Sequence, residues 1–251
     1  MVSSLFVVGI GPGSNDLMTP QASLAIERSE YVIGFSLYVS FIKEKFPNKI
    51  YISNGMQGEI ERAKKAIELA RSGHNVSIIS SGDAGIYGIA GAVFEILSTL
   101  EDNMPEVSVV PGISALSSCA SLLGSPLSND FMVLSLSDLL TPWEVIRKRA
   151  EAAAILDLVT VIYNPRGSRF PNNLEKVMEY FLKYRSGDTP VGIVRNAYRP
   201  DQSAKIVQLK DFSCSEIDML TTVIIGNSET YVSGRWMATR RGYSGKYDVR
   251  F

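Results

Sequence analysis

Short apolar runs alternate with helix-like segments along most of this 251-residue chain. Residues 5–9 and 76–79 have the length and the Val/Ile content of buried strands, whereas residues 57–71 place apolar side chains at helical spacing. A chain in which strands and helices alternate folds into α/β layers with parallel strand pairing. The pattern therefore predicts an α/β protein.

The same reading assigns the rest of the chain. Further strands are predicted at residues 31–34, 107–110, 131–136, 158–163 and 191–195. One helix is predicted to begin after a cap at Thr19 or Ser14 and to end at about residue 28, and another is predicted to follow residue 88. Further helices are predicted at 114–123, 142–153 and 173–184. The strands at 204–209 and 220–226 have no long helix between them, which indicates an antiparallel addition. We expect two α/β lobes with mixed sheets, residues 1–113 and 114–251, and a cofactor cleft between them.

Composition narrows the class of protein. Hydrophobic residues make up 45% of the chain, and the net charge of −1 gives no general attraction for nucleic acid or an anionic membrane. The longest apolar stretch, 152–163, contains Asp157 and is too short to span a bilayer, and no targeting signal is recognised, so we expect a cytoplasmic protein. Cys119 and Cys214 are isolated and His74 is the sole histidine, so no metal site is predicted.

The segment Ser80–Gly88 carries the strongest chemical signal. It follows a predicted strand and precedes a predicted helix, which places it at the carboxyl end of a strand, where α/β sheets bind ligands. Gly82, Gly85 and Gly88 let a ligand approach the main chain, and Asp83 is the one charged group. This turn predicts an enzyme that acts on a small molecule.

The glycine cluster at residues 9–13 only partly resembles a dinucleotide-binding turn. Gly9 and Gly11 match the first two glycines, but Ser14 stands at the third position and Pro12 removes a backbone donor. A rigid turn that forms a wall of the cleft explains the cluster better. A nicotinamide-dependent oxidoreductase stays as an alternative.

Several motifs together resemble the tetrapyrrole methylase superfamily, and more narrowly its precorrin-3B C17-methyltransferase branch. The superfamily motifs are GIGPG at 9–13, DLMT at 16–19, the Gly82-Asp83 turn and VPGISA at 110–115. The branch motifs are SLSDLLTPW at 135–143, YNPR at 163–166, PVGIVRNA at 190–197 and MLTTVIIGNS at 219–228. The resemblance covers residues 5 to about 243.

The resemblance implies a homodimeric enzyme that binds S-adenosylmethionine and releases S-adenosylhomocysteine. Its function would be C17 methylation, with ring contraction, of precorrin-3B or cobalt-precorrin-3 in cobalamin biosynthesis. The resemblance carries cofactor contacts onto nine positions of this chain. These are Pro12, Ser81, Gly82, Asp83, Ile86, Ser114, Ala115, Asn164 and Ala197.

The macrocycle bears many carboxylates, so its binding site needs spaced cations and amide donors. Arginines 166, 169, 195 and 199 follow second-lobe strands; we select Arg166 and Arg195, together with Ser137, as substrate-binding residues. Ring contraction also needs a proton donor or acceptor, for which Asp138, Glu59 and Asp83 are the candidates; we select Asp138 and Glu59. Helix capping or a dipole contact would equally explain these two acids.

Other functions are also compatible with the sequence. A neighbouring tetrapyrrole methylase would differ in the carbon that it methylates, and a non-catalytic tetrapyrrole carrier would not need an intact cofactor loop. Whether the natural macrocycle carries cobalt is left open, since enzymes of this type act on both metal-free and cobalt-containing rings.

Overall fold

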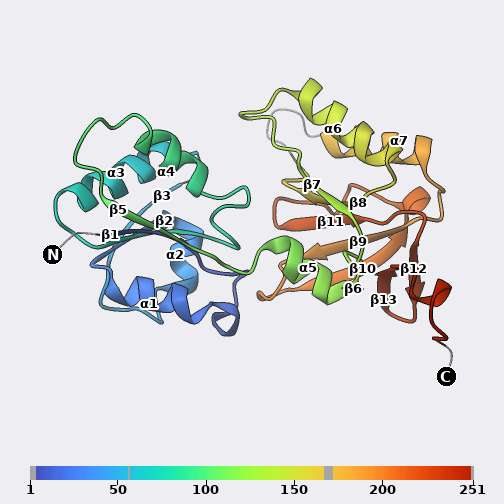
Figure 1. The fold of residues 1–251 in the computed structure, drawn as a ribbon, viewed down its shortest axis with the longest axis horizontal. Coiled ribbons are helices and arrows are strands. Elements are labelled where there is room, and N and C mark those ends of the chain that lie inside the picture. The colour runs from blue at the N-terminus through green and yellow to red at the C-terminus, as the bar shows by residue number, and fades with distance from the viewer. Residues whose placement is uncertain (1–3, 56, 167–171, 250–251) are drawn as a thin grey trace. The chain divides into compact units, whose positions relative to one another are not determined.

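A computed structural model describes residues 4–55, 57–166 and 172–249 (Figure 1). The chain divides into two compact units, Met1–Ala115 and Leu116–Phe251. Each unit is built on a five-stranded sheet with helices against it, which confirms the predicted α/β fold. Among the residues just given, no helix has both the length and the apolar character that a bilayer span needs.

The sheet of the first unit is wholly parallel, with the strand order β3-β2-β4-β1-β5. Its strands are β1 (Ser4–Gly9), β2 (Tyr31–Phe35), β3 (Ile50–Asn54), β4 (Val76–Ser80) and β5 (Glu106–Val110). Its helices are α1 (Pro20–Arg28), α2 (Ser36–Ile42), α3 (Glu59–Arg71) and α4 (Ala90–Leu97), with a 3-10 turn at Asn15–Leu17. The elements α2 and β3 were not predicted.

Helices cover both faces of this sheet, with α3 and α4 on one face and α1 and α2 on the other (Figure 1). Because side chains alternate along a strand, neighbouring residues supply opposite cores. Val7 and Ile78 pack with α3 and α4, whereas Val8 and Ile79 pack with α1 and α2. This two-sided burial explains why the strands read as continuous apolar runs.

Local signals set the helix ends. Of the two predicted caps for α1, Thr19 is used: its side chain accepts a hydrogen bond from the Ala22 amide, whereas Ser14 caps the preceding 3-10 turn. Helix α3 begins at Glu59 rather than at residue 57, because Gln57 has a φ of 69° and cannot be helical.

The second unit has a mixed sheet with the order β10-β9-β11-β8-β7. Its strands are β7 (Phe131–Ser135), β8 (Val159–Tyr163), β9 (Pro190–Arg195), β10 (Ser203–Gln208) and β11 (Thr221–Ile225). Strands β7, β8 and β9 run in one direction, and β10 and β11 run antiparallel to β9, as the sequence predicted. A small sheet of β6 (Gly124–Ser125), β12 (Thr230–Ser233) and β13 (Trp236–Thr239) was not predicted.

Helices α6 (Trp143–Ile155) and α7 (Asn173–Tyr184) pack on one face of this mixed sheet around Phe181, which is fully buried. Helix α5 (Ala115–Leu123) lies on the opposite face (Figure 1). There the Leu123 side chain fills the space that a side chain at Gly192 would need, so Gly192 of β9 is a packing requirement.

Candidate cofactor and substrate site

The sheet of the first unit has a topological switch point between β1 and β4. The chain leaves β1 through α1 toward β2, whereas it leaves the adjacent β4 through α4 toward β5 on the other side of β1. In open α/β sheets, ligands bind at the carboxyl ends of strands at such a point. The turns that follow β1 and β4 are the two glycine-rich segments noted in the sequence.

Main-chain hydrogen bonds join these two turns directly. The Gly11 amide donates to the Gly82 carbonyl at 3.1 Å, and the Gly82 amide donates to the Gly11 carbonyl at 2.7 Å. One step earlier, the Ile10 amide donates to the Ser80 carbonyl. The first glycine cluster is therefore an extension of the sheet that fixes the position of Gly82.

This arrangement rules against a nicotinamide cofactor on the first cluster. A pyrophosphate site uses free amides in the turn after the first strand. Here the amides of Ile10 and Gly11 already donate to the β4 turn, and Pro12 has none. A Cβ at Gly9 would lie 2.7 Å from the Gly112 nitrogen, so Gly9 serves close backbone packing instead.

The turn after β5 completes this edge of the sheet. Gly82 has a φ of 67°, and a Cβ built on it would lie 3.6 Å from both the Ser114 Cα and the Ala115 nitrogen. Gly82 thus faces the Ser114–Ala115 pair across a space the size of one methyl group. Residues from two distant motifs, both assigned to the cofactor by resemblance, are brought together.

The other predicted cofactor residues of this unit surround the same turns. Pro12 is buried immediately after the Gly11–Gly82 bridge, and Ser81 lies between the end of β4 and Gly82. The Ile86 side chain is 38% exposed. Main-chain groups of turns and an exposed aliphatic side chain fit a nucleoside cofactor that has polar ends and an apolar ring.

In the second unit, the carboxyl ends of β7, β8 and β9 form one edge with the start of β11. Asn164 follows β8 with a φ of 48°, and its Nδ2 donates to the Ser135 Oγ at 2.9 Å. Asn196 follows β9 with a φ of 50°, and Ala197 comes next. Asparagine tolerates this left-handed conformation better than most residues, which explains an Asn after each strand.

Arg195 at the end of β9 is held by an acid that the sequence reading missed. Its Nε donates to the Asp218 Oδ2 at 2.8 Å, and the arginine side chain stays 38% exposed. Burial would raise the pKa of Asp218, but hydrogen bonds from Thr221, Arg195 and the Leu220 amide outweigh it and lower the pKa. The charge on Arg195 is thereby fixed in place at the predicted substrate-binding edge.

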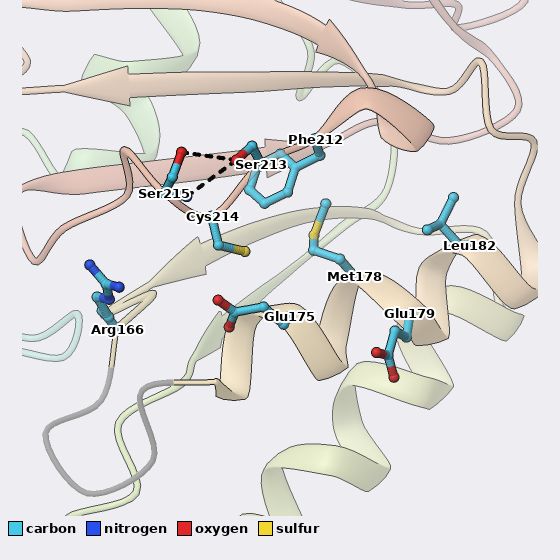
Figure 2. Close-up of a pocket in the computed structure, with 9 residues that line it drawn as sticks. All are labelled: Arg166, Glu175, Met178, Glu179, Leu182, Phe212, Ser213, Cys214 and Ser215. Atoms are coloured by element: carbon cyan, nitrogen blue, oxygen red, sulfur yellow. Dashed lines mark hydrogen bonds between the residues drawn. The ribbon is translucent and has the colours of Figure 1, made fainter.

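Arg166 lines a hollow of about 540 Å³ in the second unit, opposite Glu175 and Glu179 of α7 (Figure 2). Its Nη1 donates to the Ile217 carbonyl at 3.3 Å. Cys214 also lines the hollow, and burial, with a smaller contribution from Glu175, raises the pKa of its thiol to about 12. Arg169, another sequence candidate, lies outside the described residues.

The two acids proposed for proton transfer have different surroundings. Asp138 lies in the loop after β7 and accepts a long hydrogen bond, 3.5 Å, from the Asn173 Nδ2. It does not cap α6, because the capping position is Pro142. Glu59, the first residue of α3, is 52% exposed and pairs with the buried Arg62 at 3.6 Å. Ser137, also in the β7 loop, donates its amide to the Ser135 Oγ.

Residues 4–213 match the family model of the Tetrapyrrole (Corrin/Porphyrin) Methylases. The chain belongs to the tetrapyrrole methylases. The superfamily resemblance read from the motifs is therefore confirmed, and this family uses S-adenosylmethionine as its methyl donor.

Individual tetrapyrrole methylases resemble the chain over most of its length. The cobalt-factor III methyltransferase of Priestia megaterium is 47% identical over 99% of this chain, which spans only 47% of that longer protein. The probable cobalt-factor III C(17)-methyltransferase of Salmonella typhimurium is 45% identical, with 96% of this chain and 99% of that protein covered.

Solved tetrapyrrole methylases share the fold. The crystal structure of the methyltransferase CobJ matches with a TM-score of 0.91 and 32% identity over 95% of this chain and 100% of that one. Uroporphyrin-III C-methyl transferase from Thermus thermophilus, in complex with S-adenosyl homocysteine, matches with a TM-score of 0.66 at 20% identity over 89% of this chain and 92% of that one. The latter likeness concerns the fold alone.

Proposed function

We propose that this chain transfers the methyl group of S-adenosylmethionine to C17 of precorrin-3B or of its cobalt-containing counterpart, with ring contraction, in cobalamin biosynthesis. The observation that carries the proposal is the meeting of the Gly82 turn with the Ser114–Ala115 turn at the switch point of the first sheet. This is where the fold places a ligand site. Membership of the tetrapyrrole methylases supports the reaction class.

The first unit holds the cofactor in this proposal. The contacting positions are Pro12, Ser81, Gly82, Ile86, Ser114 and Ala115, and from the second unit Asn164 and Ala197. Asp83 belongs to the same turn, where its carboxylate accepts hydrogen bonds from the Gly85 and Gly112 amides. When bound, S-adenosylmethionine supplies a methyl group activated by the sulfonium. The protein needs to add alignment and exclusion of water rather than a strong nucleophile, because the leaving thioether requires no protonation.

Arg195, Arg166 and Ser137 bind the macrocycle in this proposal. Ser137 follows β7, Arg166 follows β8 and Arg195 is the last residue of β9, so all three lie at the carboxyl ends of these strands. The hydrogen bond to Asp218 fixes the Arg195 guanidinium there. Fixed arginines suit carboxylates on a rigid ring, since little side-chain freedom is lost on binding. Arg195→Lys is expected to raise the KM for the macrocycle and leave the affinity for S-adenosylhomocysteine unchanged.

Asp138 is our first choice for the proton transfer of ring contraction, because its loop follows β7 at the same edge as Asn164 and Arg195. Glu59 is the second choice, since its pairing with Arg62 already accounts for its position. Asp138→Asn should lower kcat for the ring-contracted product by at least tenfold. Glu59→Gln is the comparison variant.

The cobalt-containing macrocycle is the favoured substrate, because the two relatives compared above, at 47% and 45% identity, are both named for cobalt-factor III. The decisive experiment incubates the protein with S-adenosylmethionine and either cobalt-factor III or metal-free precorrin-3B under anaerobic conditions. Methyl incorporation is followed by mass spectrometry. Transfer to neither ring would reject the proposed function, and transfer to the metal-free ring alone would reject the cobalt preference.

The family resemblance supports the assembly proposed here, and the sequence expectation given above supports the location. We propose a homodimer that acts in the cytoplasm. Light scattering after size-exclusion chromatography tests the dimer: a mass of one chain at micromolar concentration contradicts it.

A further inference from the structure

Asp83 carries a negative charge in the candidate cofactor turn, and the structure shows where its carboxylate is directed. Its Oδ1 accepts a hydrogen bond from the Gly85 amide at 2.8 Å, within the same turn. Its Oδ2 accepts one from the Gly112 amide at 3.0 Å, in the turn after β5. Both oxygens are thus engaged by main-chain donors of the first unit.

The bond to Gly112 joins two turns that are packed too closely for side chains. A Cβ at Gly112 would lie 2.1 Å from the Gly82 carbonyl oxygen, and one at Gly9 would lie 2.7 Å from that same oxygen. Three turns, after β1, β4 and β5, therefore meet backbone to backbone. Asp83 is the side chain that links the second of these turns to the third.

We infer that Asp83 is a positioning residue: it latches the Gly82 turn to the Pro111–Ala115 turn and so sets the width of the cofactor site, rather than contacting the cofactor itself. The inference rests on the proposed function. Hydrogen bonds from neutral amides to a carboxylate are stronger than those to a neutral oxygen, which explains an aspartate at this position. The latch holds Gly82 opposite Ser114 and Ala115 at the separation given above.

Two substitutions separate the two bonds. Asp83→Asn keeps the shape but has one acceptor oxygen, so its NH2 group must oppose one of the two amide donors. Asp83→Ser can still cap the Gly85 amide, whereas its side chain is too short to reach Gly112. We expect both variants to bind S-adenosylhomocysteine about tenfold more weakly, as for the loss of one hydrogen bond to a charged acceptor. Asp102→Asn is the matched control, because Asp102 is an exposed acid of the same unit.

The experiment measures calorimetric affinities for S-adenosylhomocysteine and for analogues that lack a ribose hydroxyl, the amino group or the carboxylate. A positioning residue weakens every analogue by the same factor. A direct contact leaves one analogue unaffected by the Asp83 substitution, and that result would overturn the inference. The KM for S-adenosylmethionine should rise while kcat at saturation stays within twofold.

Amide hydrogen exchange without ligand provides an independent measurement. In both variants, peptides that contain Gly112 should exchange faster than in the wild type, and in Asp102→Asn they should not. Unchanged exchange at Gly112 contradicts the latch even if cofactor affinity falls. If the wild-type protein binds no S-adenosylhomocysteine at all, the proposed function fails, and the exchange result still decides whether the latch exists.

Discussion

Gly112→Ala tests whether the close meeting of turns in the first unit is needed for folding and cofactor binding. The added Cβ would lie 2.1 Å from the Gly82 oxygen and 2.7 Å from both the carbonyl carbon and oxygen of Gly9. All three are backbone atoms, so no change of side-chain rotamer relieves the overlap. The Gly82 carbonyl oxygen would have to move by roughly 1.3 Å or more to reach an ordinary contact distance.

We expect a loss of about 1 to 3 kcal/mol in the free energy of unfolding, the range for overpacked sites. Because the β4 turn itself must shift, the affinity for S-adenosylhomocysteine should fall at least tenfold as well. Gly91→Ala is the matched control. Gly91 lies exposed in α4 with no atom within 4 Å of the new Cβ, so the same chemical change should stabilise the protein by roughly 0.5 to 1 kcal/mol.

Urea unfolding followed by circular dichroism measures both stabilities, and calorimetry measures both affinities. The two alanine variants should move stability in opposite directions, and only Gly112→Ala should lose affinity. A Gly112→Ala protein with wild-type stability and wild-type affinity would show that the three turns are not packed as described.

Three further predictions concern single side chains. Gly82→Val should abolish measurable S-adenosylhomocysteine binding, because Gly82 has a φ of 67° and a side chain there would occupy the space between Gly82 and Ser114. The affinity is measured by calorimetry. Arg185→Met should lower the free energy of unfolding by about 3 to 5 kcal/mol in a urea titration, because the buried guanidinium donates to the carbonyls of residues 153, 158 and 226. The control variant Arg147→Met removes a surface arginine and should lower the free energy of unfolding by less than about 1 kcal/mol. Cys214 should react with iodoacetamide at pH 8 far more slowly in the native protein than in urea, because folding raises the pKa of its thiol to about 12. The stability that the neutral thiol contributes is complete below the unfolded pKa and declines as the pH rises from about 9 to 12. Cys214→Ala should reduce this decline.

The predictable part of the fold was the part with strong periodicity. Strands β1 and β4 are buried on both faces and carry Val and Ile on adjacent positions, and they were placed within one residue. The missed strand β3 has only exposed and half-buried residues, and it pairs with β2 at the edge of the sheet. Helix α2 follows β2 without a side-chain cap, so no start signal marked it.

The sequence assigned the turns at Gly82 and Ser114 to one cofactor only through the family resemblance, and it did not predict the contacts within the candidate site. Parallel strands place their carboxyl ends at one edge, which explains why the structure brings these two turns together. The partner of a polar side chain depends on atoms brought close only by folding. Asp83 accepts a hydrogen bond from Gly112, which lies 29 residues away in the sequence. Asp218 precedes β11 and accepts one from Arg195 at the end of β9, with which β11 pairs antiparallel. The sequence shows that Asp83 and Asp218 can accept hydrogen bonds, but it does not show which residue donates to each.

Asp83 shows why a charged residue in a ligand turn need not be a ligand contact. From the sequence it is the one charge among glycines, and that isolation favours a direct role with the cofactor. In the folded unit its carboxylate instead ties the turn after β4 to the turn after β5, which pack backbone to backbone at Gly82 and Gly112. Glycines contribute no side-chain packing of their own, so a site built from main-chain groups needs neighbouring residues that do not contact the ligand to hold its turns in position. Substitutions that act on cofactor affinity in this unit should therefore cluster at glycines and at Asp83.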